Sequence, residues 1–193
     1  MSFGGCADGN PVLEGDSEAI VALKRAGVIV DREPTPGMPD NTGHSVDATK
    51  VTINPGIAEN LGKVKTIVTL KLTGNAVTDE TLTAIANAKY LQTLDLTGCA
   101  VTNAGLKHLG SLPRLNSLTL TDTQVTAAGL ADMPQVAMLF LSHLPIGDED
   151  LENLKHLKKL GILQLDGTKV TASGVAKLKQ NRPNLIVVGV KLN

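Results

Sequence analysis

The segment from Leu91 to Leu115 reads LQTLDLTGCAVTNAGLKHLGSLPRL and contains one complete unit of the pattern on which the fold is built. Its first part alternates, with Leu94 and Leu96 on one side and polar residues on the other, which predicts a half-buried strand. Its second part changes to helical spacing, with a leucine at every third position from Leu106. Thr102 stands where a helix N-cap is expected, because its hydroxyl can accept from a backbone N–H of the first turn. One unit is therefore predicted to consist of a strand, a turn, a short helix and a connection that leads back to the next strand.

The same frame recurs along the chain at a nearly constant interval. Its first apolar residue stands at Ile67, Leu91, Leu115, Val136, Leu160 and Leu185. The interval is 24 residues except before Val136, where it is 21, and before Leu185, where it is 25. A degenerate earlier copy is expected around Val46 and Val51, with Asn54 capping its helix. One such unit cannot bury its own leucines, whereas stacked units bury them in a continuous core.

A repeat of this length with a Leu-x-x-Leu-x-Leu frame is typical of leucine-rich repeats, and the chain resembles that superfamily from about Val46 to Val190. Cys99 and the Val-Thr-x-Ala-Gly-Leu turn that begins at Val101 are similar to the cysteine-containing, F-box-associated type. The Thr-Gly-x-x-Val-Thr pattern is most similar to bacterial proteins of the planctomycete kind. The resemblance implies an α/β fold, a right-handed solenoid with a parallel β-sheet on the concave face and short α-helices on the convex face. It also implies protein binding and no enzymatic activity.

Three segments are expected along the chain. Residues 1–15 are rich in Gly and small polar residues and are expected to form a flexible tail. Residues 16–43 are expected to form a cap, with a helix that begins at Asp16 or Ser17, a short strand at Val28–Val30 and a loop from Glu33 to Gly43. Residues 44–193 form the repeat domain, continuous with the cap in a single solenoid. Within it, Met133-Pro134 predicts a helix of only about one turn in the shortened unit.

Composition excludes several classes of function. The net charge is −1, which predicts no strong overall attraction to nucleic acid or membrane. Two cysteines are too few for a disulfide scaffold or a metal cluster, and no cofactor is expected. No apolar run is long enough to span a bilayer and no signal peptide is visible, so a cytoplasmic location is the default expectation. The alternative is a structural, envelope-associated protein, lipid-anchored through Cys6 after removal of a signal sequence.

Charge is distributed unevenly along the chain. Residues 1–150 carry 10 basic and 17 acidic side chains, whereas residues 151–193 carry 8 and 2. Six basic residues are expected on the convex helices, namely Lys155, Lys158, Lys159, Lys177, Lys179 and Arg182. They provide a third candidate function, an anion-binding surface. No aromatic side chains are interleaved with them for base stacking, so nucleic acid is not the expected partner.

The strand after Val136 provides the main candidate for a binding site. If its frame leucines face inward, period-two alternation places Met138, Phe140 and Ser142 on the concave face. Carrying this register across the sheet predicts one partner-binding surface, made of Met138, Phe140, Ser142, Ile162, Gln164 and Val187. Exposed apolar patches usually mark partner surfaces, and a central aromatic such as Phe140 is a natural anchor. The alternative is that the curve of the sheet, or residues near the C-terminus, cover these side chains.

A catalytic site is not expected on this face. His143 should lie near Asp122 at the strand ends, with Ser142 and Asp166 close by. Ser142 and His143 are consecutive in a strand, however, so their side chains should point to opposite faces, and no nucleophile elbow is present.

Three further expectations concern charge and assembly. Lys71 and Asp95 are expected to form an exposed pair worth under about 1 kcal/mol. The acidic run Asp148–Asp150 is expected to favour a helix dipole rather than to bind calcium. The last strand would leave an open edge, which predicts a monomer, a weak edge-to-edge dimer or a chain cut from something longer.

Overall fold

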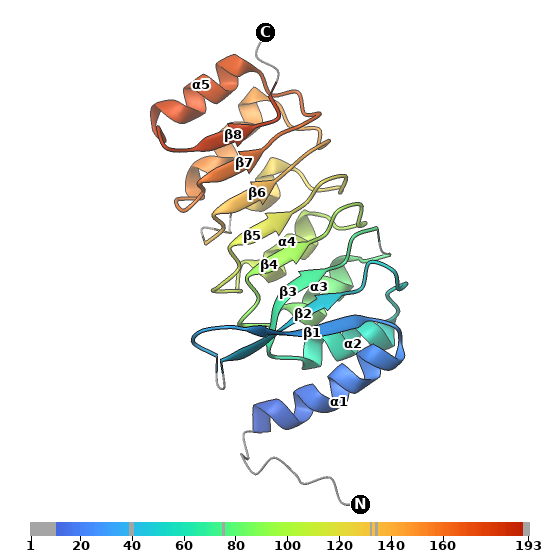
Figure 1. Cartoon of the computed structure of the whole chain (residues 1–193). Helices are drawn as coiled ribbons and strands as arrows, with labels where there is room; N and C mark the ends of the chain where they lie inside the picture. The colour runs from blue at the N-terminus through green and yellow to red at the C-terminus, as the bar shows by residue number, and fades with distance from the viewer. Residues whose placement is uncertain (1–10, 39–40, 75, 132, 134, 191–193) are drawn as a thin grey trace, which may run out of the picture.

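The strands form one sheet in which each strand lies beside its neighbour in the sequence (Figure 1). The computed structural model describes residues 11–38, 41–74, 76–131, 133 and 135–190. The strands are β1 (Ile29–Pro34), β2 (Thr42–Asp47), β3 (Ile67–Lys71), β4 (Thr93–Asp95), β5 (Ser117–Thr119), β6 (Met138–Phe140), β7 (Ile162–Gln164) and β8 (Ile186–Val188). β1 pairs with β2 in antiparallel fashion, and all later pairs are parallel.

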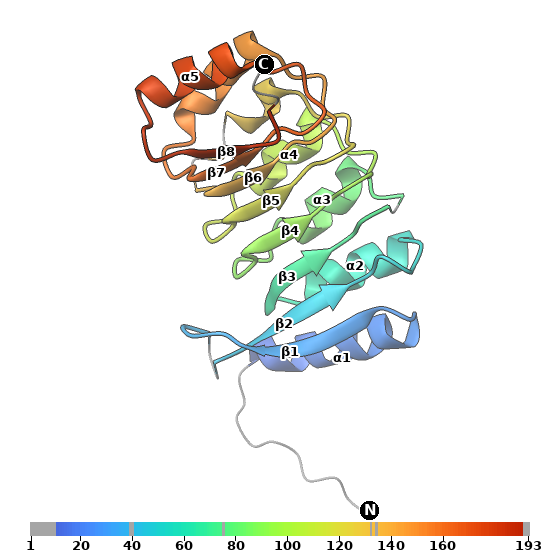
Figure 2. The ribbon, with the colours of Figure 1, turned by 45° about the horizontal axis from the view of Figure 1, so that its top comes forward.

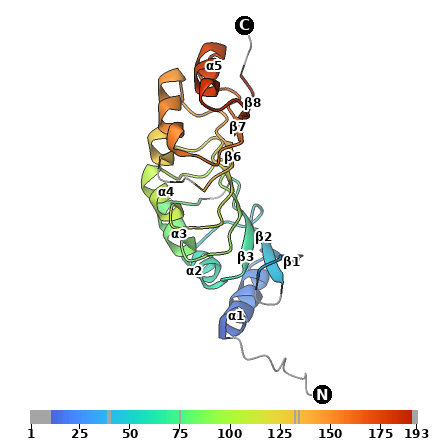
Figure 3. The same cartoon turned by 90° about the vertical axis from the view of Figure 1, so that its left-hand side faces the viewer.

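Each parallel connection carries a helix, and these helices cover one face of the sheet. The helices of these connections are α2 (Pro55–Lys63), α3 (Asp79–Ile85), α4 (Asn103–Leu109), η1 (Ala127–Leu130), η2 (Asp148–His156) and α5 (Ala172–Gln180), of which η1 and η2 are 3₁₀ helices. A further helix, α1 (Pro11–Arg25), precedes β1. Figure 2 shows the short strands side by side in one sheet, and Figure 3 shows the helices on one side of that sheet. The other side is open and concave (Figure 3). The predicted α/β solenoid is confirmed.

The core lies between the sheet and the helix layer. The frame leucines stand in register on successive strands, so Leu94 pairs with Leu118 and Leu118 pairs with Leu139. All three side chains are fully buried, and most leucines of the helices are buried beside them. The buried side chains form one continuous cluster from α1 to β8, because each repeat covers the apolar side of the one before it.

Side-chain hydrogen bonds tie successive repeats together on the helical side. In each tie, the first residue of one helix accepts a hydrogen bond from the backbone N–H of the N-cap Thr of the next helix. The same side chain also forms a hydrogen bond with the hydroxyl of that Thr. The ties join Asp79 to Thr102, Asn103 to Thr126, and Asp148 to Thr171. Gly105 follows Thr102 by three residues, and a Cβ there would collide with the Asp79 carboxylate. We call this series of ties the Asp/Asn–Thr ladder, and it explains the recurring Val-Thr-x-Ala-Gly pattern.

The ladder is interrupted at the shortened unit. Ala127 stands at the first helical position and has no side-chain acceptor, while Gly147 stands where the next Thr would be. Gly147 N donates instead to Asp150 Oδ2 in its own unit, at 2.8 Å. Asp150 and Asp148 therefore act through specific hydrogen bonds, and not only through the helix dipole that the sequence suggested. The helix of this unit, η1, spans four residues, as the sequence predicted.

The N-terminal cap differs from its prediction. α1 begins at Pro11, so the expected flexible tail is wrong for residues 11–15, and the rest of that tail, with Cys6, lies outside the described residues. The predicted start of this helix at Asp16 or Ser17 is therefore wrong as well. The Asp16 side chain does not cap the helix but forms hydrogen bonds with the segment before β3. Asp16 is buried and accepts from Lys65 N, Thr66 N and Thr66 Oγ1 at 2.6–3.0 Å. This carboxylate fastens α1 to the turn before β3.

The predicted loop after Glu33 is shorter than expected, because antiparallel pairing orders both of its ends. Pro34 closes β1 and lies opposite Thr42 of β2. A proline is tolerated there because it stands at the end of an edge strand.

The last strand is shifted by one residue from the expected register. Val187 pairs with Leu163, whose side chain is buried, and Val187 itself packs against the core. The expected place of Val187 on the open face is therefore wrong, and Ile186 and Val188 take the outward positions. The predicted interval of 25 residues was wrong, because β8 follows β7 at an interval of 24 and the buried Leu185 lies one place after the frame position. Dimerisation through this strand stays a prediction.

Candidate functional site

The open face of the sheet has two halves of different chemistry. On β3, β4 and β5 its side chains are mostly small and polar, namely Thr69, Thr73, Thr93, Thr97, Ser117, Thr119 and Thr121. Lys71 stands opposite Asp95, as expected. The expected pair does not form, since no Lys71–Asp95 ion pair joins these two described residues. The Asp95 carboxylate accepts instead from Thr73 Oγ1, Thr97 N and Thr97 Oγ1.

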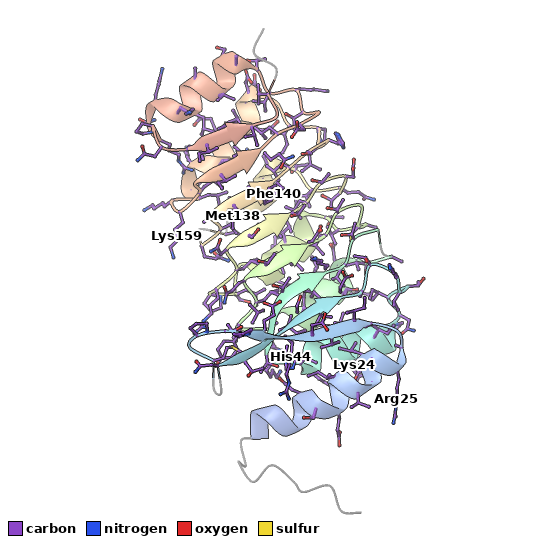
Figure 4. All side chains as sticks on the ribbon, viewed as in Figure 1. Lys24, Arg25, His44, Met138, Phe140 and Lys159 are labelled. Atoms are coloured by element: carbon purple, nitrogen blue, oxygen red, sulfur yellow. The ribbon has the colours of Figure 1, made fainter. Side chains whose placement is uncertain are left out.

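On β6, β7 and β8 the same face is apolar. Met138, Ile162 and Ile186 stand side by side in one row across the strands. Phe140, Gln164 and Val188 form the next row, and Figure 4 shows Met138 and Phe140 on the open side of β6. We call Met138, Phe140, Ile162, Ile186 and Val188 the apolar patch. Met138, Phe140 and Ile162 are partly exposed, while Ile186 and Val188 are 56% and 44% exposed.

Ser142 and Gln164, the two polar members of the predicted surface, differ in accessibility. Gln164 is partly exposed, and its Nε2 donates to Asp166 Oδ2 at 2.7 Å. Ser142 is only 5% exposed, so its expected accessible position is wrong. A serine side chain is short, and its row neighbours, Thr121 and Asp166, are longer. Its hydroxyl has no hydrogen-bond partner among the described residues.

Two adjacent turns at the carboxyl end of the strands place Asp122 beside His143. Both residues have left-handed backbone, with φ of 56° and 63°, at the place where other repeats use glycine. His143 Nδ1 lies 3.0 Å from Asp122 Oδ1, so their predicted proximity is confirmed. The His143 ring occupies the space that a Cβ at residue 167 would need, and this residue is a glycine. Ser142 Oγ does not bond to His143, so these residues do not form a Ser–His–Asp arrangement.

The two carboxylates at this edge flank the end of β6. Asp122 N donates to Ser142 O at 3.2 Å, and His143 N donates to Asp166 O at 2.7 Å. Asp122 therefore lies on one side of the Ser142–His143 turn and Asp166 on the other. In the described part of the chain, neither carboxylate pairs with a lysine or an arginine.

The six basic residues do not form the predicted cluster on the convex helices. Lys158 and Lys159 lie in the turn between η2 and β7, and Lys159 is visible at the amino edge of the sheet (Figure 4). Lys155 and Lys177 both approach Glu152, at 3.9 and 3.8 Å. Arg182 follows α5, and its Nη2 donates to Leu154 O and Lys155 O. Burial lowers the pKa of Arg182, which is typical of a structural contact rather than a free anion-binding group.

Other kinds of site find little support in the described residues. They contain no group of three metal-ligating side chains, and none of their helices has the length and apolar character needed to cross a membrane. A hollow of about 480 Å³ lies beyond β7, lined by residues 167–173 and Gly189. It opens at the last repeat, where no further unit covers the end of the described stack, and not on the open face.

Comparisons with known proteins agree with the architecture. Residues 65–86 and 87–110 match the leucine-rich repeat family model. An internalin C2 from Listeria monocytogenes has a similar structure, with 29% identity and a TM-score of 0.57, over 76% of this chain and 69% of that one. No curated protein matches.

Two further solved structures are similar in fold alone. A second Listeria monocytogenes internalin shares 19% identity with a TM-score of 0.52, over 75% of this chain and 52% of that one. A leucine-rich repeat protein of Leptospira interrogans shares 21% identity with a TM-score of 0.52, over 72% of this chain and 34% of that one. The chain therefore spans about half of the former and a third of the latter.

Proposed function

We propose that this chain, a leucine-rich repeat protein, is a non-enzymatic module that binds a protein or peptide on its concave face through the apolar patch. Stacked repeats in general present such an extended concave surface to their partners. The observation that carries the proposal is the apolar patch itself. It is continuous over three adjacent strands and stands on a face that none of the described helices covers.

Phe140 is the proposed anchor of this surface. It lies in the second row of the patch, between Thr119 and Gln164, and next to the row that holds Met138. The chain has only two phenylalanines and no tryptophan, so an aromatic ring at this place is conspicuous. Central aromatic residues of an interface typically cost 2 kcal/mol or more when truncated, which corresponds to about a 30-fold loss of affinity.

The test is a capture experiment with the full chain and two variants that each add one carboxylate. Phe140→Asp places the charge in the apolar patch, and Thr93→Asp places it in the polar half of the same face. Circular dichroism and the thermal midpoint first establish that all three proteins fold. A partner retained by the wild-type chain and by Thr93→Asp, but lost by Phe140→Asp, supports the proposal. A partner retained equally by all three overturns it and moves the site to the loops or the convex side.

A further inference from the structure

We infer that the partner is an extended peptide segment with an apolar side chain and a lysine or arginine, and that Asp122 and Asp166 receive this cation. The inference rests on the proposed function and adds the chemistry of the ligand. It concerns the carboxyl end of β6, directly beside the apolar patch. A cation placed there would be attracted by both carboxylates while an apolar side chain two to four residues away contacts Phe140.

The first argument is the unsatisfied charge at this edge. Asp122 uses one oxygen to bond His143, and Asp166 uses one to bond Gln164. The second oxygen of each carboxylate has no hydrogen-bond partner among the described side chains and backbone. An ionised carboxylate offers about four lone-pair sites, so both groups can accept a lysine or an arginine.

The comparison with Asp95 shows that these carboxylates are not simply part of the turns. Asp95 stands at the same edge, at the end of β4, and takes three hydrogen bonds from Thr73 and Thr97. That carboxylate is therefore occupied by its own sheet. Asp122 and Asp166 have no such threonine donors. Of these three carboxylates, the two beside the apolar patch keep an open oxygen.

The buried hydroxyl of Ser142 is a second, independent observation. It lies between Asp122 and Asp166 on the same strand end and lacks a partner among the described residues. A buried hydroxyl without a partner costs free energy, about 1–3 kcal/mol on mutational scales. The oxygen is buried, so a donor brought by a ligand would remove that cost where the neighbouring side chains move aside. The unpaired hydroxyl lies between the two open carboxylates.

The opposite edge of the patch has the opposite charge. Lys158 and Lys159 are exposed in the turn that leads into β7, at the amino ends of the strands. A basic side chain would be repelled there and attracted to Asp122 and Asp166. The charges therefore orient a bound segment, with its cation over the carboxyl ends of the strands.

Sheet geometry sets the spacing between anchor and cation. Two residues along a strand advance ~7 Å and one strand to the next ~4.8 Å, so Asp166 lies ~8 Å from Phe140 along the sheet. In an extended peptide, residues two apart are also ~7 Å from each other, and a lysine or arginine stem adds reach. The cation should therefore follow or precede the apolar anchor by two to four residues.

The test is selection of a displayed library of random peptides on the immobilised full chain, followed by affinity measurements with the enriched peptides. We expect enrichment of an apolar residue with a lysine or arginine two to four positions away. Asp122→Asn and Asp166→Asn should each weaken binding by about fivefold at low salt and flatten its salt dependence. Asparagine tolerates left-handed backbone, so Asp122→Asn keeps the turn intact.

Two matched variants control for charge removal itself. Lys159→Gln removes a charge at the other edge of the same patch and should not weaken binding of the basic peptide. Glu80→Gln removes an exposed carboxylate on α3, on the helical side, and should leave the affinity unchanged. A charge exchange completes the test: Asp166→Lys should lose the selected peptide and regain it when the peptide's basic residue is replaced by glutamate.

The outcomes separate the two proposals. Peptides that lose binding with Phe140→Asp but show no basic residue, or that ignore both asparagine variants, overturn this inference and leave the proposed function standing. Peptides that ignore Phe140→Asp overturn the proposed function as well. A selection without any enriched peptide overturns the inference, because it states that a short extended segment suffices.

Discussion

The repeats of β3–β5 and those of β6–β8 have the same interior and different exteriors. Leu94 and Leu118 on one side and Leu139 and Leu163 on the other occupy the same inward position and are equally buried. The outward positions change from threonines to the apolar patch. Inward side chains are constrained by the stacking of the repeats, whereas outward ones are free to vary. The proposed function rests on this outward difference.

The two halves also differ in how they are joined. The Asp/Asn–Thr ladder ties the repeats on each side of the shortened unit, but it is missing between Ala127 and Gly147. The apolar patch begins on the strand of this same junction, with Met138. A shorter crossover and a local hydrogen bond to Asp150 replace the missing tie. The repeat architecture thus tolerates the loss of one tie where the leucine core continues.

The largest effect should separate the inside of β6 from its outside. Leu139→Ala removes a fully buried side chain and should lower the free energy of unfolding by about 2–5 kcal/mol. Phe140→Ala, one residue away on the open face, should lower it by under about 1 kcal/mol, because its ring already contacts solvent. Urea unfolding followed by circular dichroism measures both. Equal losses would show that Phe140 belongs to the core and would contradict the division into two faces.

The next largest effect is expected in the cap, where the buried Asp16 carboxylate joins α1 to the turn before β3. Asp16→Ala leaves Lys65 N, Thr66 N and the Thr66 hydroxyl without their acceptor and should cost about 3 kcal/mol. Hydrogen exchange should show the loss first in α1. Glu18→Ala, an exposed change on the same helix, is the control. If α1 stays protected in Asp16→Ala, this carboxylate does not anchor the cap.

A smaller effect is expected for one tie of the ladder. Asn103→Ala removes the bonds to Thr126 N and Oγ1 and should lower the free energy of unfolding by about 1 kcal/mol. Lys107→Ala on the same helix removes an exposed side chain that makes no tie and should be neutral. Chemical denaturation of both variants provides the comparison. An equal effect would mean that the ladder contributes no more than an ordinary surface position.

The smallest effect is expected for the Asp148–Thr171 tie, which is the first tie after the shortened unit and whose contribution to stability should depend on pH. Hydrogen bonds from the Thr171 hydroxyl and N–H lower the pKa of Asp148 below its ordinary value of 3.8. The folded state therefore gains stability from the ionised carboxylate above about pH 4 and loses it as the pH falls through the folded pKa. The urea midpoint should drop between pH 6 and pH 3, and by less in Asp148→Ala. An identical drop in both proteins would exclude Asp148 as a contributor.

The candidate site was predictable where the repeats are regular and not where they end. Period-two alternation placed Met138, Phe140, Ile162 and Gln164 on the open face, because every inward neighbour on their strands is a leucine. It failed at Val187, because the prediction took Leu185 as the first frame residue, whereas β8 pairs with β7 at the regular 24-residue interval and its side chains therefore face the other way from those predicted. It also could not foresee that Ser142 is buried, since burial depends on the lengths of side chains from the two adjacent repeats.

The architecture follows from the amino-acid sequence, because the leucine frame and its 24-residue period leave few ways to bury the apolar side chains other than by stacking. Which polar side chains have hydrogen-bond partners, and which do not, depends on the folded structure. Asp16, Asp95 and Asp148 bond to segments that stacking or turns bring to them, while Asp122 and Asp166 keep free oxygens at the edge of the apolar patch. Leucines need only a dry interior, which periodicity predicts, whereas a hydrogen bond needs two particular atoms about 3 Å apart, which depends on the folded position of both repeats.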